Sequence, residues 1–319
     1  MSGTLDARLE EALAQLLAAG APGALAVAVG PWGRLSAAAG LDSSGRPLQA
    51  TSQFEVASAT KTFVAALVLA LVEDGALGLD EDVAAHLPAQ VESLGSVTAR
   101  SLLNHTSGLP DFFEDAAIAD AWRKDPSQEW NLDELIEISL ALPRHEPGRF
   151  RYANSNYLLV GLVIESVTSC RLDQAIRRRI LDPLELVETK LPRTAMAAAG
   201  GLISTADDLT RFLAALLGGE VVGEPSLREM LTTVPTEWAE SQGYGLGIEQ
   251  VESLMGFDVS PCGRAWGHIG LGPVTTVAFT TPDAKRQVVL MANAMLRSDA
   301  AWSALNGATW SVLCSKLSP

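Results

Sequence analysis

The segment SATKTFVAALVLALVEDG, residues 58–75, is the most informative stretch of this chain. From Phe63 onward it is apolar on nearly every side, which is the pattern of a helix buried in the middle of a protein. Gly75 ends the pattern, as glycine commonly does at the end of a helix. The segment therefore predicts a central buried helix that begins near Ser58.

The composition restricts the class of protein and its partners. The chain has 319 residues and a formal net charge of −15, with 48% hydrophobic and 19% charged residues. These values predict a folded, soluble protein with a substantial core. Such an acidic chain repels phosphate backbones and anionic headgroups, and the arginine run at residues 177–179 is expected on a solvated helix face. We therefore expect no nucleic acid and no membrane among its partners.

The cysteines, histidines and first residues bear on cofactors and location. Three cysteines, Cys170, Cys262 and Cys314, lie in dissimilar contexts without a CxxC spacing. The odd count argues against a disulfide framework and a zinc site, so free thiols are expected. The four histidines are scattered, and we expect no metal and no cofactor. Residues 1–20 resemble an amphipathic helix rather than a signal peptide, which predicts a cytoplasmic location.

Strand signals lie at both ends of the chain, with helical signals between them. Strands are expected at residues 24–29, 34–38, 244–251, 265–269, 275–280 and 287–293. Helices are clearest at residues 132–142, 157–168 and 206–217, and a final helix is expected at about residues 299–317. The first two strands can bury their apolar face only by pairing with others, so we expect one antiparallel sheet built from both chain ends and flanked by helices.

The predicted fold class is accordingly α+β, in a single catalytic unit. A sheet-bearing lobe would comprise residues 1–57 and 243–319, and a mostly helical region would comprise residues 58–242. We find no internal repeat.

The start of the buried helix contains a pair of residues that could perform chemistry. Positions i and i+3 share a face of a helix, so Lys61 can bring its amine beside the Ser58 hydroxyl. A serine needs a base to become a nucleophile, and a lysine can serve when burial lowers its pKa. The same residues also fit an ordinary helix N-terminus with a lysine that reaches solvent, so this motif alone leaves catalysis open.

Two further motifs accompany this pair. Tyr152-Ala153-Asn154 precedes a predicted helix, and a chain with only three tyrosines seldom contains a Tyr-x-Asn by chance. Trp266-Gly267-His268-Ile269-Gly270 lies on a predicted strand, and its glycines would let a ligand approach the backbone.

Ser-x-x-Lys, Tyr-x-Asn and a basic residue-x-Gly, in this order, resemble the pattern of the serine β-lactamase and penicillin-binding-protein superfamily. The closest likeness is to its class C β-lactamase-like esterase branch. The resemblance extends over residues 10–295 and includes shorter signatures at residues 54–58, 102–109, 146–148, 200–205 and 244–247. His105 and Ser107 belong to one of these signatures, which is structural in the family, so they are kept out of the predicted site. A β-lactamase/transpeptidase-like fold is implied.

The resemblance implies covalent acyl transfer in which Ser58 attacks a carbonyl and holds the acyl group as an ester. Lys61 and Tyr152 would share the proton transfers. Which of the two is the base stays open, because a tyrosine needs a neighbouring cation to act near neutral pH.

The resemblance also implies four substrate-binding residues. Asn154 would hydrogen-bond Lys61 and the substrate amide, and His268 and Gly270 would lie along the bound substrate. The oxyanion would lie between the N–H groups of Ser58 and Leu271, the latter just after the His268 triplet on a predicted edge strand.

The His268 triplet also bears on the substrate. Relatives that act on β-lactams or cell-wall peptides usually have Lys-Thr-Gly or Lys-Ser-Gly there, whereas a largely neutral imidazole and Ile269 weaken a carboxylate anchor. The sequence therefore predicts a cytoplasmic serine hydrolase for a small ester or amide. The alternatives are an acyltransferase for an amine or alcohol acceptor, a β-lactamase or DD-peptidase, and a catalytically silent binding protein on the same scaffold. The oligomeric state stays open.

Overall fold

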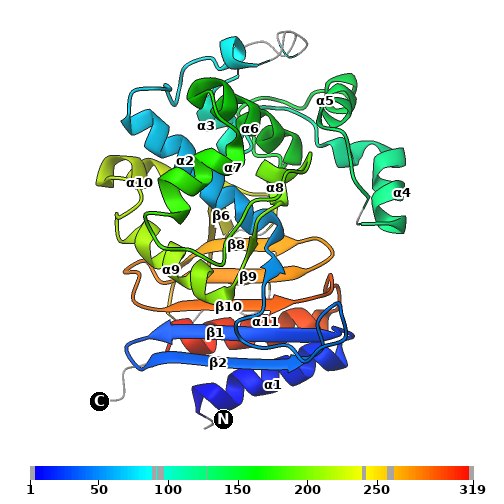
Figure 1. Ribbon diagram of the computed structural model, residues 1–319, viewed down its shortest axis with the longest axis vertical. Helices are drawn as coiled ribbons and strands as arrows, with labels where there is room; N and C mark the ends of the chain where they lie inside the picture. The colour runs from blue at the N-terminus through cyan, green and yellow to red at the C-terminus, as the bar shows by residue number, and fades with distance from the viewer. Residues whose placement is uncertain are drawn as a thin grey trace.

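The protein is built around one antiparallel sheet with helices on both faces (Figure 1). This description rests on a computed structural model that covers residues 4–87, 91, 97–126, 128–238, 242–256 and 262–315. The eight strands follow the order β2-β1-β10-β9-β8-β7-β6-β5. The first hairpin thus pairs with the last strand, which confirms the prediction of an α+β fold with a sheet made from both chain ends.

The strands expected at residues 24–29, 34–38, 265–269, 275–280 and 287–293 are present, whereas the sequence did not predict the three two-residue strands at residues 54–55, 203–204 and 234–235. The sheet contains β1 (Gly23–Gly30), β2 (Gly33–Gly40), β5 (Val234–Pro235), β6 (Gln242–Tyr244), β7 (Glu249–Val251), β8 (Ala265–Leu271), β9 (Thr275–Thr280) and β10 (Gln287–Ala292). A separate pair is formed by β3 (Phe54–Glu55) and β4 (Ile203–Ser204). The single strand expected at residues 244–251 is wrong: it is two strands joined by a tight turn. Gly247 has a φ of 69° in this turn, and a Cβ there would lie 2.8 Å from the Lys61 carbonyl oxygen.

Helices occupy the middle and the ends of the chain. The α-helices are α1 (Leu5–Ala18), α2 (Thr60–Glu73), α3 (Ala99–Leu103), α4 (Ala116–Lys124), α5 (Leu132–Ala141), α6 (Asn154–Thr168), α7 (Leu172–Ile176), α8 (Ala197–Gly200), α9 (Ala206–Leu217), α10 (Glu224–Met230) and α11 (Asp299–Leu313). Short 3-10 turns include η1 (Ala57–Ala59) before α2 and η4 (Phe112–Glu114) before α4. Within the ranges that the structure covers, none of the helices has the length and apolarity needed to cross a membrane.

The two faces of the sheet are covered by different helices. Alternate residues of β1 face opposite sides: Ala26 and Ala28 pack with α1 and α11, whereas Leu25 and Val27 pack with α2 and α9. Because both faces are covered, β1 is apolar along most of its length rather than alternating.

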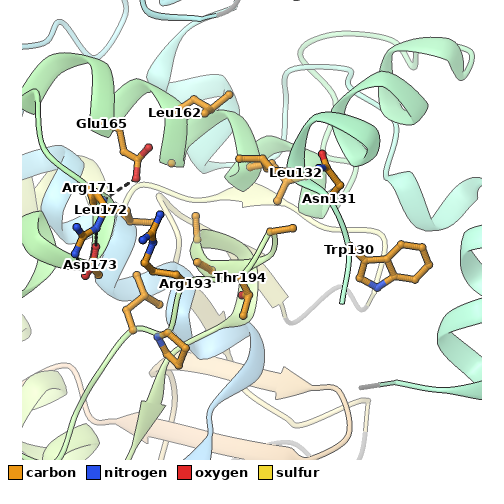
Figure 2. A pocket seen from close by; sticks show the side chains of 17 residues that line it. Trp130, Asn131, Leu132, Leu162, Glu165, Arg171, Leu172, Asp173, Arg193 and Thr194 are labelled. Atoms are coloured by element: carbon orange, nitrogen blue, oxygen red, sulfur yellow. Dashed lines mark hydrogen bonds and ion pairs between the residues drawn. The ribbon is translucent and has the colours of Figure 1, made fainter. Parts of the chain in front are cut away.

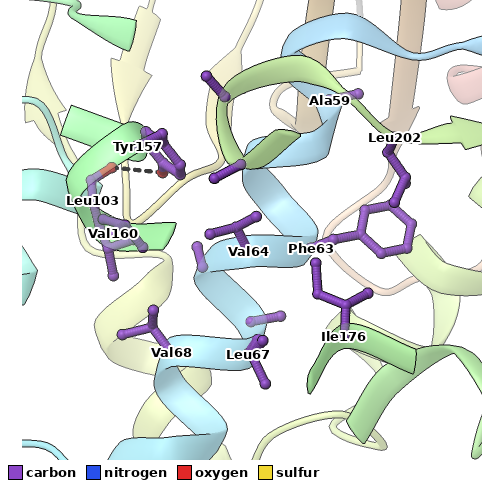
Figure 3. Close-up of a cluster of buried hydrophobic side chains, with 14 of the residues drawn as sticks. Ala59, Phe63, Val64, Leu67, Val68, Leu103, Tyr157, Val160, Ile176 and Leu202 are labelled. Carbon is purple, nitrogen blue, oxygen red and sulfur yellow. Dashed lines mark hydrogen bonds between the residues drawn. The ribbon is translucent and has the colours of Figure 1, made fainter. Parts of the chain in front are cut away.

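Each face of the sheet has its own hydrophobic core, and helix α2 is buried in the larger one, on the same face as α9. Every residue from Thr60 to Leu71 is buried. Phe63 stacks on Phe212 with ring centroids 3.5 Å apart, and Figure 3 shows Val64, Leu67 and Val68 surrounded by side chains from neighbouring elements. The packing fixes α2 in place, and with it the side chain of Lys61 in its first turn.

The prediction that all cysteines are free thiols is wrong. Cys262 and Cys314 form a disulfide, and Cys170 is free. Cys262 precedes β8 and Cys314 follows α11, so the packing of this helix near the sheet brings together residues 52 positions apart. The spacing of cysteines in a sequence does not determine such a pairing, because the pairing depends on tertiary structure.

Candidate active site

Lys61 lies at the centre of a cluster of polar groups. Its Nζ donates to Ser58 Oγ at 3.1 Å, to Asn154 Oδ1 at 2.9 Å and to the Ala199 carbonyl at 2.6 Å. The side chain is 0% exposed. Burial lowers the pKa of Lys61 to about 7, although the nearby carboxyls of Asp111 and Glu249 act in the opposite direction. A lysine in this environment can hold or release its proton near neutral pH.

Tyr152 contacts the same hydroxyl as Lys61. Its OH donates to Ser58 Oγ at 2.9 Å, and Lys61 Nζ lies 5.0 Å from the centroid of its ring. Burial raises the pKa of Tyr152 well above the usual value, while the hydrogen bond to Ser58 opposes the rise. Tyr152 is therefore neutral at pH 7 and can pass a proton, whereas the pKa of Lys61 suits a base.

Asp111, a residue that the sequence analysis missed, orients Asn154. Its Oδ2 accepts from the backbone N–H of Asn154 at 2.8 Å and from the side-chain Nδ2 at 2.9 Å. Because the amide nitrogen of Asn154 is bound in this way, its oxygen faces Lys61. Burial raises the pKa of Asp111, and the N–H donors of Phe113 and Asn154 oppose that rise. Only its place beside the 102–109 signature could have suggested Asp111.

The backbone around Ser58 is strained and closely packed. Ala57 has a φ of 45°, a left-handed conformation that costs a residue with a side chain about 1–3 kcal/mol. Strand β8 passes close by: a Cβ on Gly270 would lie 2.2 Å from the Val56 carbonyl oxygen. Gly270 is thus the residue type that allows β8 to approach the segment before Ser58.

Strand β8 lies between β9 and β7, so the prediction that it is an edge strand is wrong for residues 265–267, which pair with β7. The prediction holds only for the end of β8. Strand β7 begins at Glu249, opposite Gly267, and residues 268–271 extend past it. The Ile269 N–H points to this open side and donates to Glu249 Oε1 at 3.1 Å. Alternate N–H groups of a strand share an edge, so the Leu271 N–H points to the same side.

His268 lies beside the polar cluster around Lys61 rather than within it. Its Nε2 is 2.9 Å from Tyr244 Oη, and its Nδ1 is 2.6 Å from the Ile269 carbonyl oxygen and 3.0 Å from Glu249 Oε1. The side chain is 2% exposed, and burial together with the charge of Lys61 lowers the pKa of His268 to about 3. The imidazole is therefore neutral at pH 7.

Two apolar side chains lie exposed near these groups. Trp238 is 47% exposed, and its ring centroid is 5.6 Å from that of Tyr152. Leu271, at the end of β8, is 40% exposed. The Trp238 side chain therefore provides exposed apolar surface next to Tyr152. The Leu271 side chain provides further exposed apolar surface at the end of β8.

A separate pocket of about 430 Å³ lies between α5, α6, α7 and the segment at residues 191–198 (Figure 2). Some of its charged groups already have partners within the protein. Arg171 pairs with Asp173 at 2.9 Å, and Glu165 accepts from the Leu172 N–H at 2.9 Å. Neither Ser58 nor Tyr152 lines this pocket, so it is distinct from the polar cluster around Lys61.

Comparisons with known proteins identify the family and the fold. The family model described as Beta-lactamase matches residues 7–306. A crystal structure of a D-stereospecific amidohydrolase from Streptomyces sp. superposes with a TM-score of 0.80 at 29% identity, over 93% of this chain and 97% of that one. A penicillin-binding protein from Bacillus halodurans has the same fold, with a TM-score of 0.76 at 23% identity over 96% and 99% of the two chains.

The fold and the matches thus define a serine β-lactamase-like protein. The chain belongs to the Beta-lactamase family, within the superfamily of serine β-lactamases and penicillin-binding proteins that the sequence motifs indicated. Among curated proteins, protein flp of Staphylococcus aureus (strain N315) is 32% identical over 152 residues, which are 45% of this chain. The match spans 29% of the length of that relative.

The close approach of β8 to Ser58 gives a first prediction. Gly270→Ala should displace β8, because the new methyl group would meet the Val56 carbonyl oxygen. We expect a loss of reactivity at Ser58 of about a hundredfold, the usual cost of a displacement of about 1 Å at a catalytic centre. The rate of Ser58 labelling by a fluorophosphonate measures it.

The matched control is Gly307→Ala in α11, where a Cβ meets no atom within 4 Å. It should leave the labelling rate unchanged and stabilise the helix by up to about 1 kcal/mol. Equal labelling rates in the Gly270→Ala variant and the control would contradict the proposed contact.

Proposed function

We propose that this protein is a serine hydrolase that forms an acyl-enzyme on Ser58 and hydrolyses a small amide or ester. The observation that carries the proposal is the contact of the Ser58 hydroxyl with both Lys61 Nζ, at 3.1 Å, and Tyr152 OH, at 2.9 Å. A nucleophile within hydrogen-bond distance of a base that is itself held in place is the arrangement that covalent catalysis requires.

In the proposed acylation, neutral Lys61 accepts the Ser58 proton while Oγ attacks the substrate carbonyl carbon. The new O–C bond places a negative charge on the carbonyl oxygen, which the N–H groups of Ser58 and Leu271 stabilise. When the tetrahedral intermediate collapses, the bond to the leaving amine or alcohol breaks. The leaving group takes a proton from the Lys61 ammonium through the Tyr152 hydroxyl, so the charges balance.

Deacylation follows the same path with water as the nucleophile. Lys61 accepts a proton from water, and the resulting hydroxide attacks the ester carbon. The bond to Ser58 Oγ then breaks, and Ser58 regains its proton from Lys61. Asn154, held by Asp111, would keep the amine of Lys61 aimed at Ser58 throughout.

A neutral substrate with an apolar group suits this site best. The imidazole of His268 is uncharged and has partners at both nitrogens, so it offers no cation to a substrate carboxylate. The exposed side chains of Trp238 and Leu271 supply apolar contact area beside the reacting groups. A D-stereospecific amidohydrolase among the structural relatives favours an amide as the scissile bond.

The disulfide bears on the compartment in which the protein works. The Cys262–Cys314 disulfide is typical of proteins from oxidising environments, which weighs against the predicted cytoplasmic location. Cell fractionation with thiol trapping tests this: a reduced pair in the soluble cytoplasmic fraction supports the prediction, and an oxidised pair outside it contradicts the prediction.

The acyl-enzyme is tested by labelling with a fluorophosphonate probe followed by mass spectrometry. The adduct should lie on Ser58, and Ser58→Ala should abolish it. Lys61→Ala should slow labelling by about 10²–10⁴-fold, the usual contribution of a general base. An adduct on another residue, or an unchanged rate in Lys61→Ala, would overturn the proposal.

The preference for neutral substrates is tested with a matched pair of p-nitroanilides. One carries a free carboxylate next to the acyl group and the other carries the corresponding primary amide. We expect the neutral member to have the higher kcat/KM by about tenfold or more, because the buried His268 cannot offset the desolvation of a carboxylate. A preference for the carboxylate would contradict this assignment.

A further inference from the structure

A chain of buried polar side chains lies next to the site, and the proposed mechanism does not use it. His105 Nε2 is 3.3 Å from Tyr244 Oη, Tyr244 Oη is 2.9 Å from His268 Nε2, and His268 Nδ1 is 3.0 Å from Glu249 Oε1. All four side chains are buried. They come from the loop after α3 and from β6, β8 and β7, so no short sequence motif contains them together.

The direction of the first hydrogen bond follows from the backbone of Ala153. Its N–H lies 3.2 Å from His105 Nδ1, and an amide N–H can only donate. His105 Nδ1 therefore carries no proton. Burial and the charge of Lys61 lower the pKa of His105 well below its usual value, so the ring is neutral with its proton on Nε2. His105 thus donates to Tyr244.

The remaining directions follow in turn. Burial raises the pKa of Tyr244, so the phenol keeps its proton. Its oxygen accepts from His105, and Tyr157 is a further hydrogen-bond partner. The Ile269 carbonyl oxygen, 2.6 Å from His268 Nδ1, can only accept, so Nε2 of the neutral ring has no proton and accepts from the Tyr244 O–H. The neutral ring of His268 then carries its proton on Nδ1, which faces Glu249 Oε1 and the Ile269 carbonyl oxygen. Glu249 Oε1 can accept whether or not the other oxygen of this carboxyl is protonated.

The two ends of the chain are attached to opposite parts of the site. At one end, Ala153 lies between Tyr152 and Asn154 in the sequence. At the other end, Glu249 Oε1 also accepts from the Ile269 N–H, two residues before Leu271 on the same open edge of β8. A change in any link would alter the separation between the segment at residues 152–154 and the end of β8.

We infer that His105, Tyr244, His268 and Glu249 are positioning residues that form one directed hydrogen-bond chain between the two walls of the catalytic site. The chain holds the Tyr152–Asn154 segment and the Leu271 N–H at a fixed separation on either side of the reacting carbonyl. None of the four touches the reacting atoms. The inference rests on the proposed function for its catalytic effect, but the hydrogen-bond pattern itself does not.

The pattern is tested by long-range ¹H–¹⁵N correlation spectra of the histidine side chains in the full-length protein at pH 7. His105 should be neutral with its proton on Nε2, and His268 should be neutral with its proton on Nδ1. Single variants, His105→Gln and His268→Gln, assign the signals. The opposite tautomer at either ring, or a charged ring, would overturn the inference whether or not the protein is a hydrolase.

The positioning effect is tested by Tyr244→Phe, which removes one hydroxyl and keeps the ring. The rate constant for fluorophosphonate labelling of Ser58, measured per folded molecule, should fall by about tenfold or more, because small displacements reduce reactivity steeply. Glu249→Leu is the second variant if Tyr244→Phe does not fold. It removes the acceptor of the His268 Nδ1–H and Ile269 N–H groups, so its labelling rate should fall in the same direction.

The matched control is Asp208→Asn. Asp208 is another buried carboxyl, which accepts from the Thr189 hydroxyl at 2.7 Å and from the Glu188 N–H at 3.1 Å. Neither of these partners belongs to the hydrogen-bond chain of His105, Tyr244, His268 and Glu249. The control variant should lower stability and leave the labelling rate constant within about twofold, since it removes only structural contacts.

The outcomes separate the two proposals. If wild-type protein is labelled at Ser58 and both Tyr244→Phe and Glu249→Leu react as fast as Asp208→Asn, the positioning role is wrong and the proposed function stands. If wild-type protein is never labelled, the proposed function is wrong, and so is the catalytic role of the hydrogen-bond chain. The histidine tautomers would still show whether the four side chains are hydrogen-bonded in the inferred directions.

Discussion

The burial of the Lys61 amine is the interaction on which the rest of this site depends. An ammonium group taken out of water is costly unless it is hydrogen-bonded, and here three acceptors surround it. The remaining desolvation lowers the pKa of Lys61 to about 7. The same apolar packing that makes α2 the centre of the protein therefore also gives its lysine the proton affinity that a base needs.

The surroundings balance this desolvation with buried carboxyls. Asp111 and Glu249 both oppose the lowering of the pKa of Lys61, and each also binds backbone N–H groups of the site. Asp111 fixes the position of Asn154, and Glu249 fixes the open edge of β8 at Ile269. Each carboxyl thus raises the pKa of Lys61 and also holds one backbone segment of the site in place through a hydrogen bond.

The parts of the structure that could be predicted from sequence are those with a local cause. Strand signals at both chain ends led to the antiparallel sheet built from those ends, and the i, i+3 spacing placed Ser58 beside Lys61. Asp111 and Glu249 lie outside every motif, and Tyr244 begins one of the shorter signatures without a role assigned to it. The importance of all three comes from burial beside residues far away in the sequence, which no local pattern shows. The disulfide escaped prediction for the same reason, and the single strand expected at residues 244–251 ignored the turn that packs against Lys61.

The central claim is that buried Lys61 acts as the base for Ser58 near neutral pH. The most direct test is the rate of Ser58 acylation by an uncharged ester, followed by stopped flow from pH 5 to pH 10. Because only the neutral amine accepts a proton, the rate should rise with pH along a single ionisation with a midpoint near 7 and then level off. A rate that is flat through this range, or that rises only near the ordinary lysine pKa of about 10.4, would contradict the account.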